Sequence, residues 1–336
     1  MTWNNDRHIG IGGDPDDVLT SVALRAQMNG ADFDVSYQPA GFLKQAVAWQ
    51  DPEFTVPVYE KGEYAGQPKQ FYIVREDTNE VVGQHSAKYP KRDAYRHNFQ
   101  VLDQAFPNTC ENVQVWDNGG VCLVSQRIGD EVELPMGDSL AQYVYSVMSL
   151  NGTKRTMTIP KARRISCTNA LGIAMAIISS KATRNHDERV SFQAEVFEKS
   201  NIQLDRLVRT ATQLTTKKFS DEDFGRMVDA LVPPLEKDAS TRAINKYKRT
   251  RNSMLKAWVS EANTFDDKNM WVAFNAIQGA EQHSVNANFK SEDDYGYDEG
   301  QRKSIFNALE GGTPLADACE EYLMRMVAIG QAPALV

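Results

Sequence analysis

The stretch YVYSVMSLNGTKRTMTIP, residues 143–160, sets two runs rich in Tyr, Val, Thr and Ile on either side of Asn151 and Gly152. β-Branched and aromatic residues favour strands, and Asn-Gly is the residue pair most typical of a two-residue hairpin turn. The stretch therefore predicts a β-hairpin whose second strand ends at Pro160. Because side chains alternate along a strand, Tyr143 and Tyr145 should share one face, which is either the core or a surface for stacking nucleic-acid bases.

Two further hairpins are predicted upstream. QFYIVREDTNEVVGQHSAKY, residues 70–89, has strand-like runs around the turn 77–79, and NVQVWDNGGVCLVSQRI, residues 112–128, has them around 118–120. Between them, residues 91–106 place Tyr95, Phe99, Leu102 and Phe106 at helical spacing. We expect this helix to pack on the sheet.

After His186 the pattern changes to long helices, because apolar residues recur at helical spacing between cap and breaker sequences. Ser220 and Asp266 are the predicted helix starts. The expected ranges are 188–218, 221–232, 239–261, 265–280 and 301–328. The sequence thus predicts an α+β fold, with an N-terminal antiparallel sheet of hairpins and packed helices followed by an all-helical C-terminal region. We place the domain boundary between residues 1–188 and 189–336.

The stretch PKARRISCTNALGIAMAIISS, residues 160–180, puts Lys161, Arg163 and Arg164 directly before an apolar run. We expect a helix over 166–180, and cations at the N-terminus of a helix interact unfavourably with its dipole unless an anion lies between them and the free N–H groups. The side chain of Asn169 would add a further donor. The anion is either a phosphate or a carboxylate of the protein itself, and both interpretations stay open.

Charge is strongly segregated along the chain. The net charge is −8, yet residues 139–186 contain no Asp or Glu and seven Lys or Arg. A second window without acid, residues 240–260, carries Arg242, Lys246, Lys248, Arg249, Arg251 and Lys256. A surface that binds anions must exclude carboxylates as well as supply cations. The two windows therefore indicate a polyanionic ligand.

Several other classes of function are disfavoured. The four cysteines and five histidines are scattered without zinc spacing, and the sequence around Gly10–Asp14 lacks the features of a phosphate loop. We find no nucleophile or metalloprotease motif, so we expect no metal and no cofactor, and the sequence favours a non-catalytic protein. No apolar run is long enough to span a bilayer, and no export signal is recognisable at the N-terminus. We expect the protein in the cytoplasm of the host cell.

The central residues resemble the phage and plasmid-like protein family known as domain of unknown function 932. The matching positions are Arg164, Cys167, Asn169, Ala170, Leu171, Arg184 and His186, together with the hairpin upstream. The family usually has Arg-His-Thr where this chain reads TRNH, residues 183–186, so the role of His186 is left open. The resemblance spans residues 40 to about 290 and implies a mobile-element origin. The order of elements is also similar, more distantly, to ring-forming single-strand annealing recombinases, which bind single-stranded DNA in a basic groove.

The leading hypothesis is a non-catalytic single-stranded nucleic-acid-binding protein of phage replication, annealing or recombination, with DNA or RNA as ligand. The expected contacts are Lys154, Arg155, Lys161, Arg163, Arg164, Asn169, Lys181 and Arg184, with Lys246, Lys248, Arg249 and Arg251 as a secondary site. Tyr143, Tyr145, Trp116 and Trp258 are candidates for base stacking. One alternative is a metal-dependent nuclease. Another is an assembly or host-interaction protein whose basic face binds an acidic protein, and a homo-oligomer, as a ring or filament, is expected.

Overall fold

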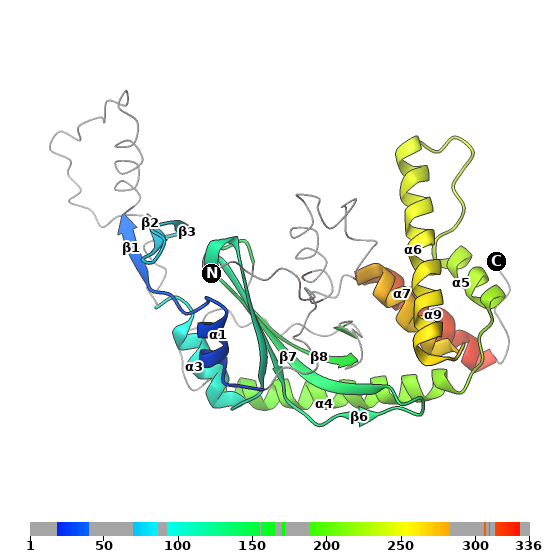
Figure 1. Ribbon diagram of the computed structural model, residues 1–336, viewed down its shortest axis with the longest axis horizontal. Coiled ribbons are helices and arrows are strands. Elements are labelled where there is room, and N and C mark those ends of the chain that lie inside the picture. The colour runs from blue at the N-terminus through cyan, green and yellow to red at the C-terminus, as the bar shows by residue number, and fades with distance from the viewer. Residues whose placement is uncertain are drawn as a thin grey trace.

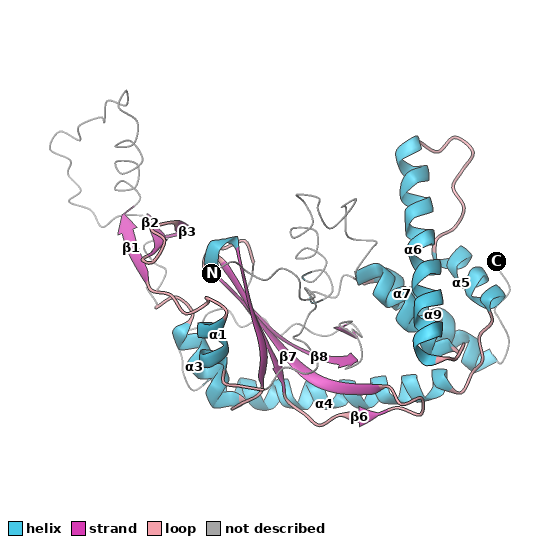
Figure 2. Ribbon diagram, viewed as in Figure 1, coloured by secondary structure: helices cyan, strands magenta, loops and turns pink. Residues whose placement is uncertain are grey.

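The computed structural model describes residues 19–39, 70–86, 93–154, 156–164, 170–171, 188–282, 306, 309 and 313–329. Two antiparallel sheets occupy the N-terminal half of the described chain and helices the C-terminal half (Figure 2). The predicted α+β fold is therefore confirmed.

The larger sheet is built around the long strand β7. Its strand order is β4-β5-β7-β8-β9, with β6 paired to β7. In the register, Tyr143 of β7 lies opposite Lys161 of β8, and Val121 of β5 lies opposite Ser149. The strands are β4 (Cys110–Trp116), β5 (Val121–Arg127), β6 (Val132–Glu133), β7 (Ser139–Ser149), β8 (Met157–Arg164) and β9 (Ala170–Leu171).

The hairpin predicted over 143–160 is present, but its turn is not the two-residue Asn-Gly turn. The last paired residues are Val147 and Met157, so the connection is a wider loop. Asn151 shapes this loop, because its side-chain oxygen accepts hydrogen bonds from the backbone N–H and hydroxyl of Thr153 at 3.0 and 2.7 Å. Its amide also donates to Asp117 at 3.0 Å, which ties the loop to the β4–β5 turn. These side-chain bonds outweigh the local turn preference of Asn-Gly.

Strand β8 runs through Pro160 and ends at Arg164, so the prediction that the strand ends at the proline is wrong. Proline has no N–H to donate to a ladder and is tolerated where its nitrogen faces an unpaired edge. On one side of β8, Pro160 lies opposite Val144 of β7. On the other side, β9 pairs only with Ala162 and Arg163, so among the described residues no strand lies beside Pro160 there. The helix predicted over 166–180 is also wrong at residues 170–171, which form β9; the rest of that range lies outside the described residues.

A smaller antiparallel sheet, in the order β1-β2-β3, packs near the β7–β8 loop. A Cβ on Gly83 would lie 2.0 Å from the carbonyl oxygen of Leu150, so this strand approaches the loop too closely for any side chain. The predicted hairpins over 70–89 and 112–128 are both confirmed. The bounds here are β1 (Val35–Pro39), β2 (Gln70–Arg75), β3 (Val81–Ser86) and the 3-10 turn η1 (Asp117–Gly119).

Helices cover one face of the larger sheet. α1 (Val22–Met28) and α3 (Arg96–Ala105) lie at one end, and α4 (Glu188–Thr215) runs along the sheet (Figure 1). Phe99 and Leu102 of α3 pack against Val113 and Val124 of the sheet, as the helical spacing predicted. On α4, Asn201 accepts a hydrogen bond from Gln142 of β7 at 2.7 Å.

The remaining helices form the C-terminal part. They are α5 (Asp221–Leu231), α6 (Thr241–Phe265), α7 (Met270–Ala280) and α9 (Pro314–Ile329). Ser220 caps α5 in a capping box with Asp223, which confirms that start. Asp266 does not begin a helix. It ends α6 in a left-handed conformation, and Asn269 caps α7, because its side chain accepts from the N–H of Val272.

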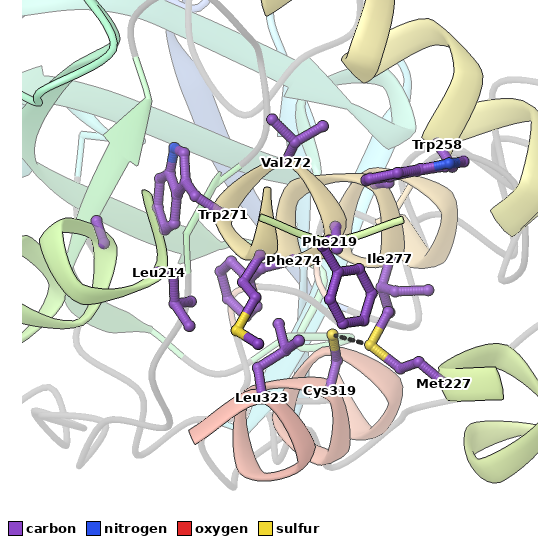
Figure 3. Close-up of a cluster of buried hydrophobic side chains, with 14 of the residues drawn as sticks. Leu214, Phe219, Met227, Trp258, Trp271, Val272, Phe274, Ile277, Cys319 and Leu323 are labelled. Carbon is purple, nitrogen blue, oxygen red and sulfur yellow. Dashed lines mark hydrogen bonds between the residues drawn. The ribbon is translucent and has the colours of Figure 1, made fainter. Parts of the chain in front are cut away.

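A large hydrophobic core joins these helices to the sheet. Trp271, Phe274 and Ile277 of α7 lie over Cys319 and Leu323 of α9 (Figure 3). The same cluster contains Leu134, Leu140 and Ala162 from the sheet region. Apolar burial is therefore continuous across the boundary placed at residue 188, and the division into two domains remains a prediction.

Candidate nucleic-acid interface

Arg164, the last residue of β8, is buried between two carboxylates. Its Nε lies 2.9 Å from Asp138 Oδ1, and its Nη1 lies 2.8 Å from Glu261 Oε2 on α6. The indole N–H of Trp271 donates to the other oxygen of Asp138 at 3.1 Å. The guanidinium also stacks on Phe265, 4.3 Å from the ring centroid. These contacts bind the sheet to α6 and α7.

This arrangement identifies the anion for Arg164. Its side chain is 1% exposed, and the carboxylates that neutralise it belong to the protein. The dipole argument assumed a helix over 166–180; Lys161 and Arg164 instead lie in strand β8, and residues 170–171 of that range form strand β9. Removing one partner from this buried network would leave an uncompensated charge, so the partners depend on one another. Burial withholds Arg164 from a ligand.

Lys161 is buried as well, at 2% exposure, on the sheet face that it shares with Tyr143. Burial lowers the pKa of its amine to about 8, and the nearby charge of Asp317 on α9 opposes this shift. A charged amine is costly to bury without a close partner. Lys161 therefore does not offer a surface charge to a polyanion.

The structure says less about the remaining expected contacts between residues 154 and 184. Lys154 is half-buried, with its ammonium 4.2 Å from the ring centroid of Phe306. Arg163 lies in β8 opposite Ala141, but its side chain is not described. Four predicted contacts lie outside the described residues, together with His186: Arg155, Asn169, Lys181 and Arg184.

The aromatic residues proposed for base stacking face the interior. Tyr143 and Tyr145 are 1% and 0% exposed, so the shared face predicted by alternation is the core. Trp258 is buried and stacks on Phe224 at 4.6 Å. Trp116 packs edge-on against Phe306. Three of these rings are therefore buried, and Trp116 is half-buried.

The second predicted cluster lies on α6, whose N-terminal half stands clear of the other labelled helices (Figure 1). Ser240 begins the helix, because its side chain accepts from the N–H of Ala243. The first buried position is Thr250, followed by Met254, Trp258 and Ala262, which pack into the helical core. Residues 241–249 are therefore held in place through the C-terminal half of the helix, which is packed in the core.

Four exposed cations share one face of α6. With 3.6 residues per turn, they fall within about 80° of its circumference and span about 21 Å of its length. We call this set the basic stripe: Arg242, Lys246, Arg249 and Lys256. No Asp or Glu occurs on the helix before Glu261, which is bound to Arg164. The sequence of α6 thus contributes no acid to the face that carries the stripe.

The secondary site predicted from the sequence is thus only partly brought together. Lys246 and Arg249 belong to the stripe, whereas Lys248 is exposed on another side of the helix. Arg251 points toward α5, where it forms an ion pair with Asp229 and lies over Tyr247. Arg242 and Lys256 are not among the predicted contacts, although the helical period places both on the same face as Lys246.

The described part of the chain contains no group of His, Cys, Asp or Glu that could hold a metal ion. Within the same residues, no helix is both long enough and apolar enough to cross a membrane. Cys110, Cys122 and Cys319 are buried free thiols whose pKa is raised by burial.

The family model of the Domain of unknown function (DUF932) matches residues 89–304, which is more than half of the chain. The chain therefore belongs to this family, and the resemblance drawn from the sequence is confirmed. No curated protein matches the chain. No solved structure matches it either.

Proposed function

We propose that the chain is a non-catalytic nucleic-acid-binding protein and that the basic stripe of α6 is its contact surface. One observation carries this proposal: Arg242, Lys246, Arg249 and Lys256 are exposed along one face of a projecting helix that has no acid before Glu261. The distant resemblance to annealing recombinases suggests that the protein acts in strand annealing or recombination. We expect it to act on the bound strand in the cytoplasm of the host cell.

The energetics favour such a surface despite the net charge of −8. Phosphate backbones bind through the release of condensed counterions, which depends on the local cations rather than on the sum over the protein. Beyond about one Debye length, roughly 8 Å at physiological salt, exposed carboxylates elsewhere are largely screened. A helix that stands away from the rest of the fold brings its cations closer to the ligand than to most of those carboxylates.

The test is binding of a fluorescein-labelled oligothymidylate of about 20 nucleotides at low salt, followed by fluorescence anisotropy. We expect the full chain to bind and the variant Lys246→Gln/Lys256→Gln to bind at least about tenfold more weakly, because two phosphate contacts are lost. Glutamine keeps good helix propensity, so the helix should form in the variant.

The matched control is Arg209→Gln/Lys217→Gln, which removes the same net charge from exposed positions outside α6. We expect this control to bind within about threefold of the parent. Equal weakening in both variants would indicate a dependence on net charge alone and would reject the stripe as the contact surface. Absence of binding by the parent would reject the proposed function.

A further inference from the structure

The aromatic residues of the described chain are withdrawn from the surface. No Phe, Tyr or Trp whose side chain the structure describes is exposed; each is buried or half-buried. Proteins that bind unpaired bases usually stack them on exposed aromatic rings. The described surface therefore presents no fully exposed ring on which an unpaired base could stack.

The same holds on α6 itself, beside the basic stripe. Tyr247 is half-buried and is covered by the guanidinium of Arg251, and Trp258 is buried against Phe224. Phe265 is half-buried beneath Arg164. All three aromatic rings of the helix are thus engaged with other groups of the protein.

The exposed face of α6 carries cations, which bind strongly to the sugar–phosphate backbone, and no exposed aromatic ring. Lys and Arg bind phosphate oxygens as charges and hydrogen-bond donors, and these contacts carry no sequence information. Ser253 is half-buried on the same side of the helix, between Arg249 and Lys256, and carries a hydroxyl that can donate to phosphate. The spacing fits a polymer of phosphodiesters along about 21 Å of helix.

We propose that the stripe recognises the phosphodiester backbone alone and needs no base, so that its ligand class is any chain of phosphodiesters, single-stranded or double-stranded. This inference rests on the proposed function and replaces the preference for single strands that the sequence suggested. The physical reason is that the predicted stacking residues are buried or half-buried, while the four cations of the stripe are exposed.

The experiment compares three probes with the full chain at low salt: labelled oligothymidylate, the same length of abasic deoxyribose phosphate, and a duplex of equal length. We expect the abasic strand to bind within about threefold of oligothymidylate, and the duplex to bind at least as tightly, because its phosphates are denser. The variant Lys246→Gln/Lys256→Gln should weaken all three to a similar degree.

The outcomes separate the two proposals. Loss of even one stacked base weakens binding by about 5- to 150-fold, so an abasic strand that binds more than tenfold below oligothymidylate overturns the backbone-only inference and leaves the proposed function standing. A preference of more than tenfold for the single strand over the duplex also overturns it. If none of the probes binds, both proposals fail. Circular dichroism of the variant confirms that α6 is folded in each comparison.

Discussion

Replacing Lys161 by methionine should stabilise the protein at neutral pH. The amine is 2% exposed, and burial lowers its pKa from 10.5 to about 8. Methionine has a similar length and volume and carries no charge to desolvate. Each tenfold change in proton affinity corresponds to about 1.4 kcal/mol, so the pKa difference of about 2.5 predicts a gain of about 3 kcal/mol at pH 7.

The gain must depend on pH with a definite sign. Below pH 8 the amine is protonated in both states, and the folded state bears the full cost of the buried charge. Between pH 8 and 10.5 the unfolded state binds more protons, so the parent gains stability as the pH rises. The advantage of Lys161→Met should therefore shrink to about 1 kcal/mol at pH 10 and vanish above that.

The assay is urea denaturation of parent and variant at pH 7 and pH 10, with Lys217→Met as the control. Lys217 is exposed, so its substitution should change the free energy of unfolding by less than about 0.5 kcal/mol. The reasoning is refuted if Lys161→Met is less stable than the parent at pH 7. It is also refuted if the difference between the two proteins does not fall as the pH rises, because the buried charge would then not be its cause.

Three further predictions concern a buried ion pair, a close contact between a strand and a loop, and a helix cap. Asp138→Ala should lower the free energy of unfolding by about 3–5 kcal/mol, because Arg164 loses a buried partner; a loss below 1 kcal/mol in chemical denaturation would contradict this. Gly83→Ala should cost about 1–3 kcal/mol, since the new methyl would meet the backbone of Leu150, and an unchanged melting temperature would show that the strand can shift. Ser220→Ala should cost about 1 kcal/mol through loss of the α5 cap, whereas Ser220→Asp should restore most of it.

Much of the fold could be predicted because its signals are local. The hairpin turns, the helix containing Phe99 and Leu102, and the capping box of Ser220 each depend on neighbouring residues. The failures have a tertiary cause. Strand β8 continues past Pro160 because pairing with β7 holds it, and the residues at 170–171 pair with β8 instead of forming a helix.

The candidate site was harder to predict for the same reason. The sequence left open whether a phosphate or a carboxylate of the protein neutralises Arg164. The carboxylates that do so, Asp138 and Glu261, are 26 and 97 residues away in the chain. No local pattern reveals such partners. The basic stripe was within reach, because the helical period alone groups Arg242 with Lys246. The burial of Lys161 and Arg164, by contrast, could not be read from the sequence.

The most direct test of the central claim, that the basic stripe of α6 binds a phosphodiester backbone, is the salt dependence of binding. Four phosphate contacts predict that the logarithm of the association constant for a single strand falls with the logarithm of salt concentration with a slope of about −3. Lys246→Gln/Lys256→Gln should reduce this slope by about half, while Arg209→Gln/Lys217→Gln should leave it unchanged. A parent slope shallower than about −1, or the same slope in parent and stripe variant, would contradict the account.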